Sequence, residues 1–150
     1  MPSSIVKKPL KLFIDENLPK QFAEAFNIIQ SHLNTQEKKP IEVYSMKEIN
    51  EGATDIEWFK KLKDENAIIL TQDRNIQRHK HEREAYEKNG IGIIFFKQPK
   101  GGLSFWNAFK YIVKYWDEIK QICRKNELPF AYRQPGQNKK FIRWNSPSNN

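Results

Sequence analysis

Four carboxylates stand out: three follow segments expected to form strands of a β-sheet, and the fourth lies at the start of an expected helix that leads into one of those strands. Asp15 and Glu16 close the apolar run that begins at Lys11, and Asp73 follows the apolar run 67–71. Asp55 precedes a helical pattern that leads into that second run. Because the carboxyl ends of parallel strands open onto one crevice, acids from separate strands converge there. We therefore expect these acids to lie close together.

Carboxylates gathered in one crevice repel one another unless a cation lies among them. Carboxylate oxygens are the ligands that Mg²⁺ and Mn²⁺ prefer. We predict one or two such ions held by Asp15, Asp55 and Asp73, with Glu16 as a further catalytic candidate. The ion would polarise a scissile phosphate and lower the pKa of a bound water. For Asp55, which follows Thr54, a helix N-cap is the alternative role.

The spacing of apolar residues predicts the elements that must position these acids. Strands are expected over residues 11–15, 41–44, 67–71 and 91–96, and helices over 20–33, 56–62, 76–89 and 103–123. Strands that alternate with helices are typical of βαβ units joined by right-handed crossovers. The predicted fold is an α/β fold, a three-layer α/β/α sandwich with a mostly parallel central sheet.

The last segment of the chain differs from the rest in composition. Residues 124–150 hold six basic residues and one acid, with aromatic residues between them. We predict a hairpin of 130–134 against 140–144, with an extended arm as the alternative. The aromatic side chains either stack on a ligand or bury against the long helix. We expect a domain of residues 1–123 and a basic C-terminal extension of residues 124–150 packed on the same domain.

The net charge of +8 is distributed unevenly along the chain. Residues 1–70 hold 10 basic and 11 acidic residues, and residues 71–150 hold 16 basic and 7 acidic residues. This asymmetry is typical of a protein that attracts a polyanionic ligand with a basic surface and acts on it at an acidic site. The aromatic residues between the basic ones favour single-stranded RNA as that ligand. The predicted RNA-binding residues are Arg74, Arg78, Lys80, Arg83, Arg133, Lys139, Lys140 and Arg143. The alternative for the first four is a solvated helix face with local acidic partners.

Composition also excludes several classes of protein. No apolar run approaches the roughly 20 residues of a transmembrane helix, and the N-terminus lacks the apolar core of a signal peptide. One cysteine, Cys123, and three histidines form no zinc-ligand pattern. We expect a cytoplasmic protein without a membrane partner, and we leave homo-oligomer formation open.

Three short motifs in order carry a resemblance to a known family. They are Leu12-Phe-Ile-Asp-Glu-Asn-Leu-Pro19, Glu51-Gly-Ala-Thr-Asp-Ile-Glu-Trp58 and Leu70-Thr-Gln-Asp-Arg-Asn75. Over roughly residues 10–100 the chain resembles the PIN-like nucleases, especially a branch of small toxin-like proteins. The resemblance implies a metal-dependent ribonuclease that acts as the toxin of a toxin–antitoxin pair, with an antitoxin protein that would cover the crevice.

The resemblance also assigns roles to individual residues. Asp15 matches the family's first acid, Asp55 an acid of its middle region, and Asp73 the acid after the later strand. Asn75 departs from the pattern, because the family commonly has a second acid at that place. A neutral residue there leaves open the number of metal ions and the activity of the site.

Two other classes of function remain as alternatives. A receiver module of a signalling protein also combines an acid pair after its first strand, a later aspartate and a lysine near its last strand. Asp15 with Glu16, Asp73 and Lys97 echo that arrangement. A non-catalytic RNA-binding protein would use the basic extension alone. A P-loop and a Rossmann glycine fingerprint are both absent from the sequence.

Overall fold

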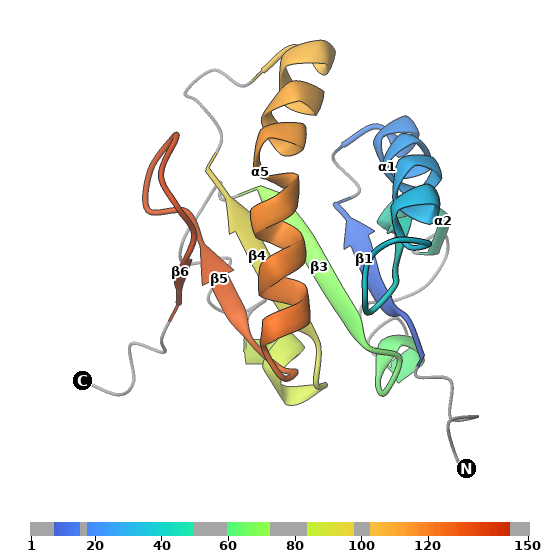
Figure 1. Ribbon diagram of the computed structural model, residues 1–150. Helices are drawn as coiled ribbons and strands as arrows, with labels where there is room; N and C mark the ends of the chain where they lie inside the picture. The colour runs from blue at the N-terminus through green and yellow to red at the C-terminus, as the bar shows by residue number, and fades with distance from the viewer. Residues whose placement is uncertain (1–7, 16–17, 50–59, 73–83, 98–102, 145–150) are drawn as a thin grey trace.

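A mixed β-sheet forms the centre of the molecule (Figure 1). The computed structural model describes residues 8–15, 18–49, 60–72, 84–97 and 103–144. Within these ranges the sheet has six strands in the order β2-β1-β3-β4-β5-β6. The strands are β1 (Leu10–Ile14), β2 (Ile41–Ser45), β3 (Ala67–Gln72), β4 (Gly92–Phe96), β5 (Ala131–Arg133) and β6 (Ile142–Arg143). Neighbouring strands are parallel except for β5 and β6, which confirms the predicted α/β fold with a mostly parallel sheet.

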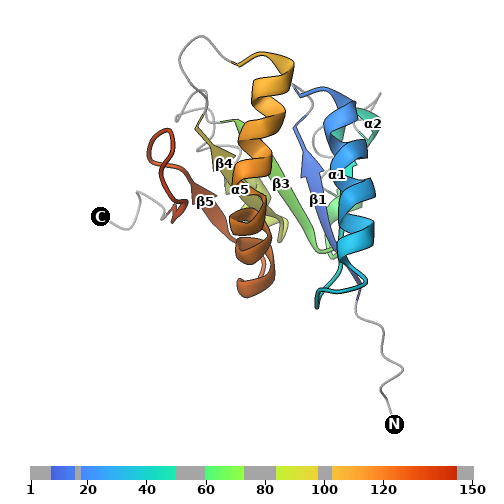
Figure 2. The same cartoon turned by 45° about the horizontal axis from the view of Figure 1, so that its top comes forward.

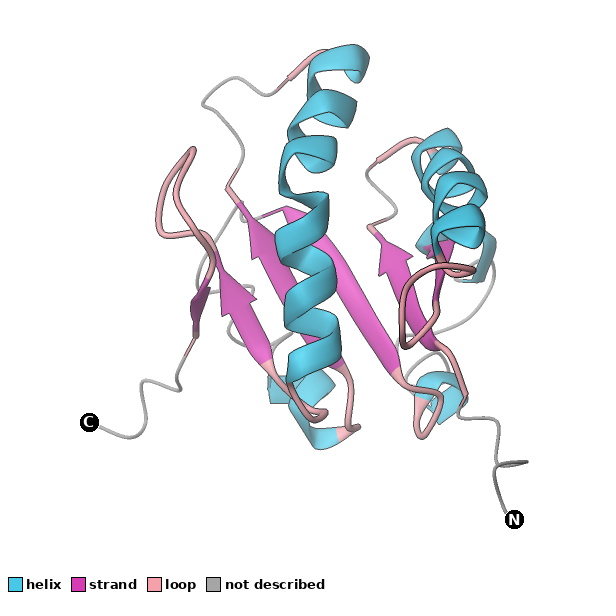
Figure 3. Cartoon of the chain, viewed as in Figure 1, coloured by secondary structure: helices cyan, strands magenta, loops and turns pink. Residues whose placement is uncertain are grey.

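Helices cover both faces of the sheet. The long helices α1 (Lys20–Leu33) and α5 (Phe105–Lys125) lie side by side over one face (Figures 1 and 2). The short helix α2 (Met46–Ile49) and the helical residues 60–62 and 84–88 lie on the other face (Figure 3). Their side chains Met46, Leu62 and Tyr86 belong to the core of that face. The three layers follow from strands that are apolar on both faces and therefore need a covering layer on each.

The alternation of side chains along the strands divides the core in two. Leu12 and Ile14 of β1 pack in the cluster under α1 and α5, whereas Phe13 points into the opposite cluster. In β3 and β4 every side chain is buried, so these strands appear in the sequence as continuous apolar runs. The two strands that flank the sheet's midline are thus its most hydrophobic elements.

Local hydrogen bonds explain where the observed bounds differ from the expected ones. The Ser104 hydroxyl accepts the Asn107 N–H at 3.3 Å, so α5 begins after Ser104. The Ser45 hydroxyl accepts the Lys47 N–H at 3.2 Å at the start of α2, a helix that the apolar pattern did not predict. The helices expected over 56–62 and 76–89 are seen at 60–62 and 84–88. Residues 56–59 and 76–83 lie outside the described ranges, and Asn89 belongs to the turn that follows the second helix.

The C-terminal residues continue the sheet. Strand β5 pairs with β4, and β6 returns antiparallel to β5, so the hairpin prediction is confirmed and the extended arm is wrong. Phe130 lies directly over Gly92, where an added Cβ would stand 2.9 Å from the Phe130 ring. Phe130 and Phe141 are buried, and Trp144 packs edge-on against Phe95 with ring centroids 5.1 Å apart. These aromatic side chains therefore close the fold.

A polar network ties the loop after α1 to the C-terminal part of α5. Lys120, 3% exposed, donates to both carboxylate oxygens of Glu37 at 3.0 and 2.9 Å. Arg124 donates to Glu37 Oε1 at 2.9 Å and Gln30 donates to the same atom at 3.1 Å. The Lys120 hydrogen bond is the main reason that the pKa of Glu37 falls from 4.5 to about 2. Trp116 completes the network by donating to Gln30 Oε1 at 3.1 Å.

In the part of the chain that the structure describes, no helix has the length and apolar character needed to cross a membrane.

Candidate functional site

The carboxyl ends of the parallel strands lie at one edge of the sheet, which we call the carboxyl edge (Figure 1). At this edge β1 ends at Ile14 and is followed by Asp15, and β3 ends at Gln72. The chain leaves β1 towards β2 on one side and later returns to β3 on the other side. Such a reversal of strand order is where open α/β sheets bind ligands. The topology therefore places the candidate site between the ends of β1 and β3.

Asp15 lies at this point and is held by contacts from two directions. Its backbone N–H donates to the Leu70 carbonyl at 3.0 Å, which continues the pairing of β1 with β3. The Thr71 hydroxyl donates to Asp15 Oδ2 at 2.8 Å between two buried side chains. The Asp15 carbonyl accepts the Leu18 N–H at 3.0 Å in the turn that leads to α1. The carboxylate is thus oriented by both strands of the candidate site.

The Thr71 hydroxyl is a feature that the sequence analysis missed. Threonine at the end of a strand is a common β-former, so nothing in its position signals a partner for Asp15. A hydrogen bond from a neutral hydroxyl is compatible with a role as metal ligand, because an ionised carboxylate can accept hydrogen bonds and metal bonds together. A residue that orients a ligating carboxylate in this way commonly contributes to metal affinity.

The other predicted residues of the acidic site lie outside the described residues. Among the predicted acids the structure describes Asp15 alone. The residues of the predicted site and of the predicted RNA-binding helix that lie outside the described ranges are Glu16, Asp55, Asp73, Arg74, Asn75, Arg78, Lys80 and Arg83. Within the described ranges no three His, Cys, Asp or Glu side chains are grouped so that they could hold a metal ion. Asp73 is nevertheless the next residue in the sequence after Gln72, the last residue of β3.

The predicted basic residues of the extension do not gather around Asp15. Strand β5 is separated from β1 by β3 and β4, which at a spacing of about 4.8 Å per strand amounts to about 14 Å. Lys139 and Lys140 are exposed in the loop that follows β5. Arg133 lies over the Trp144 ring at 5.8 Å, and Arg143 over the Tyr132 ring at 5.4 Å.

Arg143 in particular is directed away from the carboxyl edge. Its guanidinium donates to Asn126 Oδ1 at 2.8 Å, and Asn126 follows the C-terminal end of α5. Because α5 runs from the carboxyl edge to the opposite edge, this contact lies at the far side of the sheet (Figure 1). Lys139 and Lys140 are therefore better placed than Arg143 to meet a ligand at Asp15.

Gln134, a second residue that the sequence analysis missed, fixes the loop that carries these lysines. Its side chain is fully buried and its Oε1 accepts the Lys97 N–H at 2.7 Å and the Tyr111 hydroxyl at 2.9 Å. Its Nε2 donates to the Lys139 carbonyl at 3.0 Å, and its N–H donates to Phe95. The loop after β5 is thereby joined to the end of β4 and to α5.

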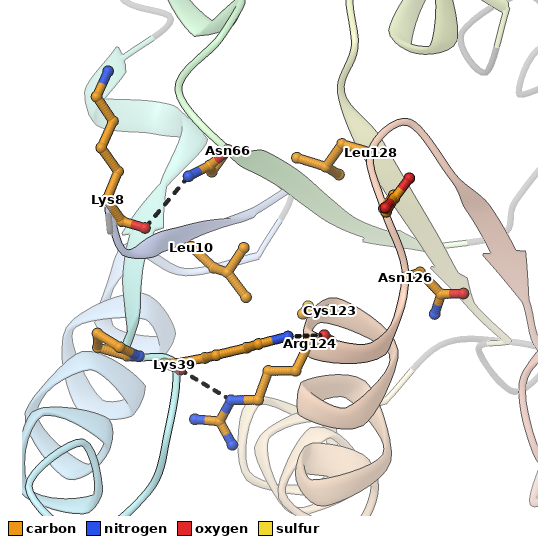
Figure 4. A pocket seen from close by; sticks show the side chains of 10 residues that line it. Lys8, Leu10, Lys39, Asn66, Cys123, Arg124, Asn126 and Leu128 are labelled. Atoms are coloured by element: carbon orange, nitrogen blue, oxygen red, sulfur yellow. Dashed lines mark hydrogen bonds between the residues drawn. The ribbon is translucent and has the colours of Figure 1, made fainter. Parts of the chain in front are cut away.

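A cavity of about 850 Å³ lies at the opposite edge of the sheet (Figure 4). Its lining comes from the segments that precede β1, β2 and β3 and from the end of α5, and includes Leu10, Lys39, Asn66 and Arg124. Lys39 Nζ donates to the Arg124 carbonyl at 2.8 Å, and Arg124 Nε donates to the Lys39 carbonyl at 3.0 Å. The cavity is remote from Asp15, and Lys39 and Arg124 are engaged in these structural contacts.

Comparison with known families identifies a domain in this chain. A family model described as a PIN like domain matches residues 10–98, which is more than half of the chain. The matched segment contains β1 to β4, Asp15 and Thr71, whereas α5, β5 and β6 follow it. Neither the curated proteins nor the solved structures include a match to this chain.

Proposed function

Because the chain belongs to the PIN-like domain family, a family associated with nuclease activity, we propose that it is a metal-dependent ribonuclease. The observation that carries the proposal is the Asp15 carboxylate at the point where strand order reverses, oriented by the Thr71 hydroxyl at 2.8 Å. Carboxylate oxygens are the ligands that a divalent cation such as Mg²⁺ prefers in proteins.

The donor set fits such an ion by its chemistry. Asp15, together with Asp55 and Asp73, would hold Mg²⁺ or Mn²⁺ through hard carboxylate oxygens, and Glu16 would be available as a further acid. When bound, the ion would lower the pKa of a water and stabilise charge on the phosphate. Thr71 would keep Asp15 in a fixed orientation, and the buried strand ends would exclude bulk water from one side of the site.

Single-stranded RNA is the proposed substrate. Residues 71–150 carry 16 basic and 7 acidic residues, and the loop with Lys139 and Lys140 opens at the carboxyl edge. Phosphate contacts from such residues supply affinity without reading sequence. The roles of Arg74, Arg78, Lys80 and Arg83 as phosphate ligands, and of Arg133 and Arg143 as further contacts, belong to the same proposal.

The proposal is tested by metal-dependent cleavage of a labelled single-stranded RNA. Purified protein is expected to lose cleavage in EDTA and to regain it with added Mn²⁺ or Mg²⁺. Asp15→Asn should reduce the rate by at least about 100-fold, as is usual when a metal-ligating or catalytic carboxylate is lost. Cleavage that persists in EDTA and in the Asp15→Asn variant would rule out the mechanism.

A toxin role is the finer part of the proposal and follows from the resemblance of the three motifs to small toxin-like PIN proteins. Its partner would be an antitoxin protein that covers the carboxyl edge or inserts a basic side chain beside Asp15. Expression of the wild-type chain in a bacterial host should arrest growth, and expression of Asp15→Asn should not. Equal growth with both chains, at equal protein levels, would argue against a toxin.

Strand order also favours testing a signalling function. The order β2-β1-β3-β4-β5 is the flavodoxin-like order that receiver modules share. A receiver would take a phosphoryl group on Asp73 from a small phosphodonor in the presence of Mg²⁺, with the donor's leaving group released. Mass spectrometry after incubation with acetyl phosphate would detect the added group. We expect none, and a stable phosphoryl group on Asp73 would favour the receiver over the nuclease.

A further inference from the structure

Two large aromatic side chains are exposed side by side at the start of α5. Phe105 is 54% exposed and Trp106 is 61% exposed, although both belong to the helix that covers the core. Helices α1 and α5 both begin at the carboxyl edge, the edge at which Asp15 lies (Figures 1 and 2). Adjacent exposed rings are therefore placed beside the candidate site rather than on a remote surface.

Both rings pack against aromatic side chains of α1 and α5. Phe105 meets the buried Phe22 edge-on, with centroids 4.8 Å apart, and Trp106 stacks on Phe109 at 5.9 Å with 15° between the planes. Phe109 in turn lies 4.9 Å from Phe26 in the core. Rings that are already ordered lose little conformational entropy when a ligand binds. The pair has the properties of a preformed contact surface.

The chain connects this surface directly to Asp15. The Asp15 carbonyl accepts the Leu18 N–H, and the Pro19 carbonyl accepts the Phe22 N–H, both at 3.0 Å. Phe22 thus lies in the first turn of α1, immediately after the turn that leaves Asp15. The ring that supports Phe105 therefore follows the candidate catalytic carboxylate by seven residues in the chain.

The charges around the two rings indicate what kind of molecule would cover them. Residues 103–116 contain Lys110 and Lys114 and no acid, and Lys110 lies one helical turn after Trp106 on the exposed side of α5. Flat aromatic faces beside cations are typical of surfaces that bind single-stranded nucleic acids, because bases stack on the rings while phosphates meet the cations.

From this arrangement we propose that Phe105 and Trp106 form a stacking platform for an unpaired base of the RNA, next to the phosphate that meets the Asp15 site. Lys110 binds a neighbouring phosphate. The platform follows the segment that matches the PIN-like family, so it is a feature of this chain beyond that match. The platform proposal rests on the proposed function only in taking RNA as the ligand, and it does not require that the protein cleaves RNA.

The test measures binding separately from cleavage. Fluorescence anisotropy of a labelled single-stranded oligouridylate is recorded with the full chain in EDTA, with gels to show that the RNA stays intact. Trp106→Ala should weaken affinity by about 5- to 160-fold, the effect of losing one base–aromatic stack. Trp106→Phe should retain affinity to within about 3-fold, because a ring remains, whereas Trp106→Leu should lose it.

Ile28→Ala is the matched control. Ile28 is an exposed apolar residue of α1, and helical geometry turns it about 200° from Phe26, which faces α5. Its replacement should leave affinity unchanged. Lys110→Ala should lower the slope of log affinity against log salt by about 0.7, whereas Trp106→Ala should leave the slope unchanged. Melting temperatures of all variants verify that each is folded.

The outcomes separate the platform from the proposed function. If binding depends on Trp106 and no metal restores cleavage, the platform stands and the ribonuclease proposal fails. If cleavage is metal-dependent and Trp106→Ala binds RNA like Ile28→Ala, the platform is wrong. A dimer that Trp106→Ala converts to monomer, with RNA affinity retained, would assign these rings to self-association and would also overturn the proposal.

Discussion

Replacing Glu37 with glutamine should destabilise the protein at neutral pH. The buried Lys120 ammonium would keep its charge but lose the carboxylate that forms its main ion pair. The Lys120 side chain is 4% exposed and its Nζ lies 2.9 Å from Glu37 Oε2. Removing one partner of a buried ion pair costs about 3–5 kcal/mol. Glu37 is 28% exposed and Asp117 lies 3.8 Å from Lys120, so we expect a smaller cost of about 2–3 kcal/mol.

The same network predicts a loss of stability in acid. The pKa of Glu37 falls from 4.5 to about 2 because Lys120, Gln30 and Arg124 donate to its carboxylate, against the opposing effect of desolvation. Between these values the unfolded chain binds more protons than the folded one, so stability is fully present above pH 4.5 and is lost as the pH falls to 2. The shift sets an upper limit of about 3 kcal/mol, which solvent at the carboxylate lowers to about 2 kcal/mol.

Urea denaturation followed by tryptophan fluorescence measures both effects, since Trp116 belongs to the network. Glu65→Gln is the control, because Glu65 pairs with Lys11 at 3.3 Å in a more exposed position and should cost at most about 1 kcal/mol. Lys120→Met added to Glu37→Gln should recover part of the loss. The reasoning is refuted if Glu37→Gln costs no more than Glu65→Gln, or if its difference from wild type stays constant between pH 4.5 and 2.

Three further changes test other parts of the structure. Thr71→Val should lower the free energy of unfolding by about 1–2 kcal/mol in urea denaturation and, on the proposed function, raise the metal concentration needed for cleavage about 10-fold. An unchanged metal titration would show that Thr71 does not orient Asp15. Gly92→Ala should cost about 1–3 kcal/mol, because its Cβ would stand 2.9 Å from Leu128 and Phe130, whereas Gly136→Ala, 3.6 Å from its nearest neighbour, serves as a mild control. Burial raises the pKa of Cys123 to about 12, so a thiol reagent at neutral pH should react only after urea unfolds the chain, and fast reaction in the native state would contradict this.

The fold was predictable because its strongest signals are local. Strands β3 and β4 are buried on both faces and therefore form uninterrupted apolar runs, and the stripes of α1 and α5 recur at helical spacing. The bounds were less predictable because they depend on single caps. With Ser104 as its cap, α5 begins two residues later than the apolar pattern alone indicates, and the Ser45 hydroxyl accepts the Lys47 N–H at the start of the short helix α2.

The candidate site was predictable only in part. Asp15 could be found because an acid after a buried strand is costly without a partner. Thr71 could not, because the hydrogen bond to Asp15 joins residues 56 positions apart. Gln134 likewise acts through backbone groups of Lys97 and Lys139, and Glu37 through Lys120, 83 positions away. Such pairings depend on which elements become neighbours in the fold, and the sequence pattern does not specify these neighbours.

The geometry of α5 separates the residues that stabilise the fold from those proposed to bind RNA. Trp106 stands in the first turn at the carboxyl edge, and Lys120 lies 14 residues further along, which corresponds to about 21 Å at 1.5 Å per residue. Substitutions this far apart without shared partners act almost independently. A loss of RNA affinity in Trp106→Ala therefore cannot be attributed to the Glu37 network. Conversely, Glu37→Gln should change the folded fraction while each folded molecule keeps its affinity, so either half of the helix serves as a control for the other.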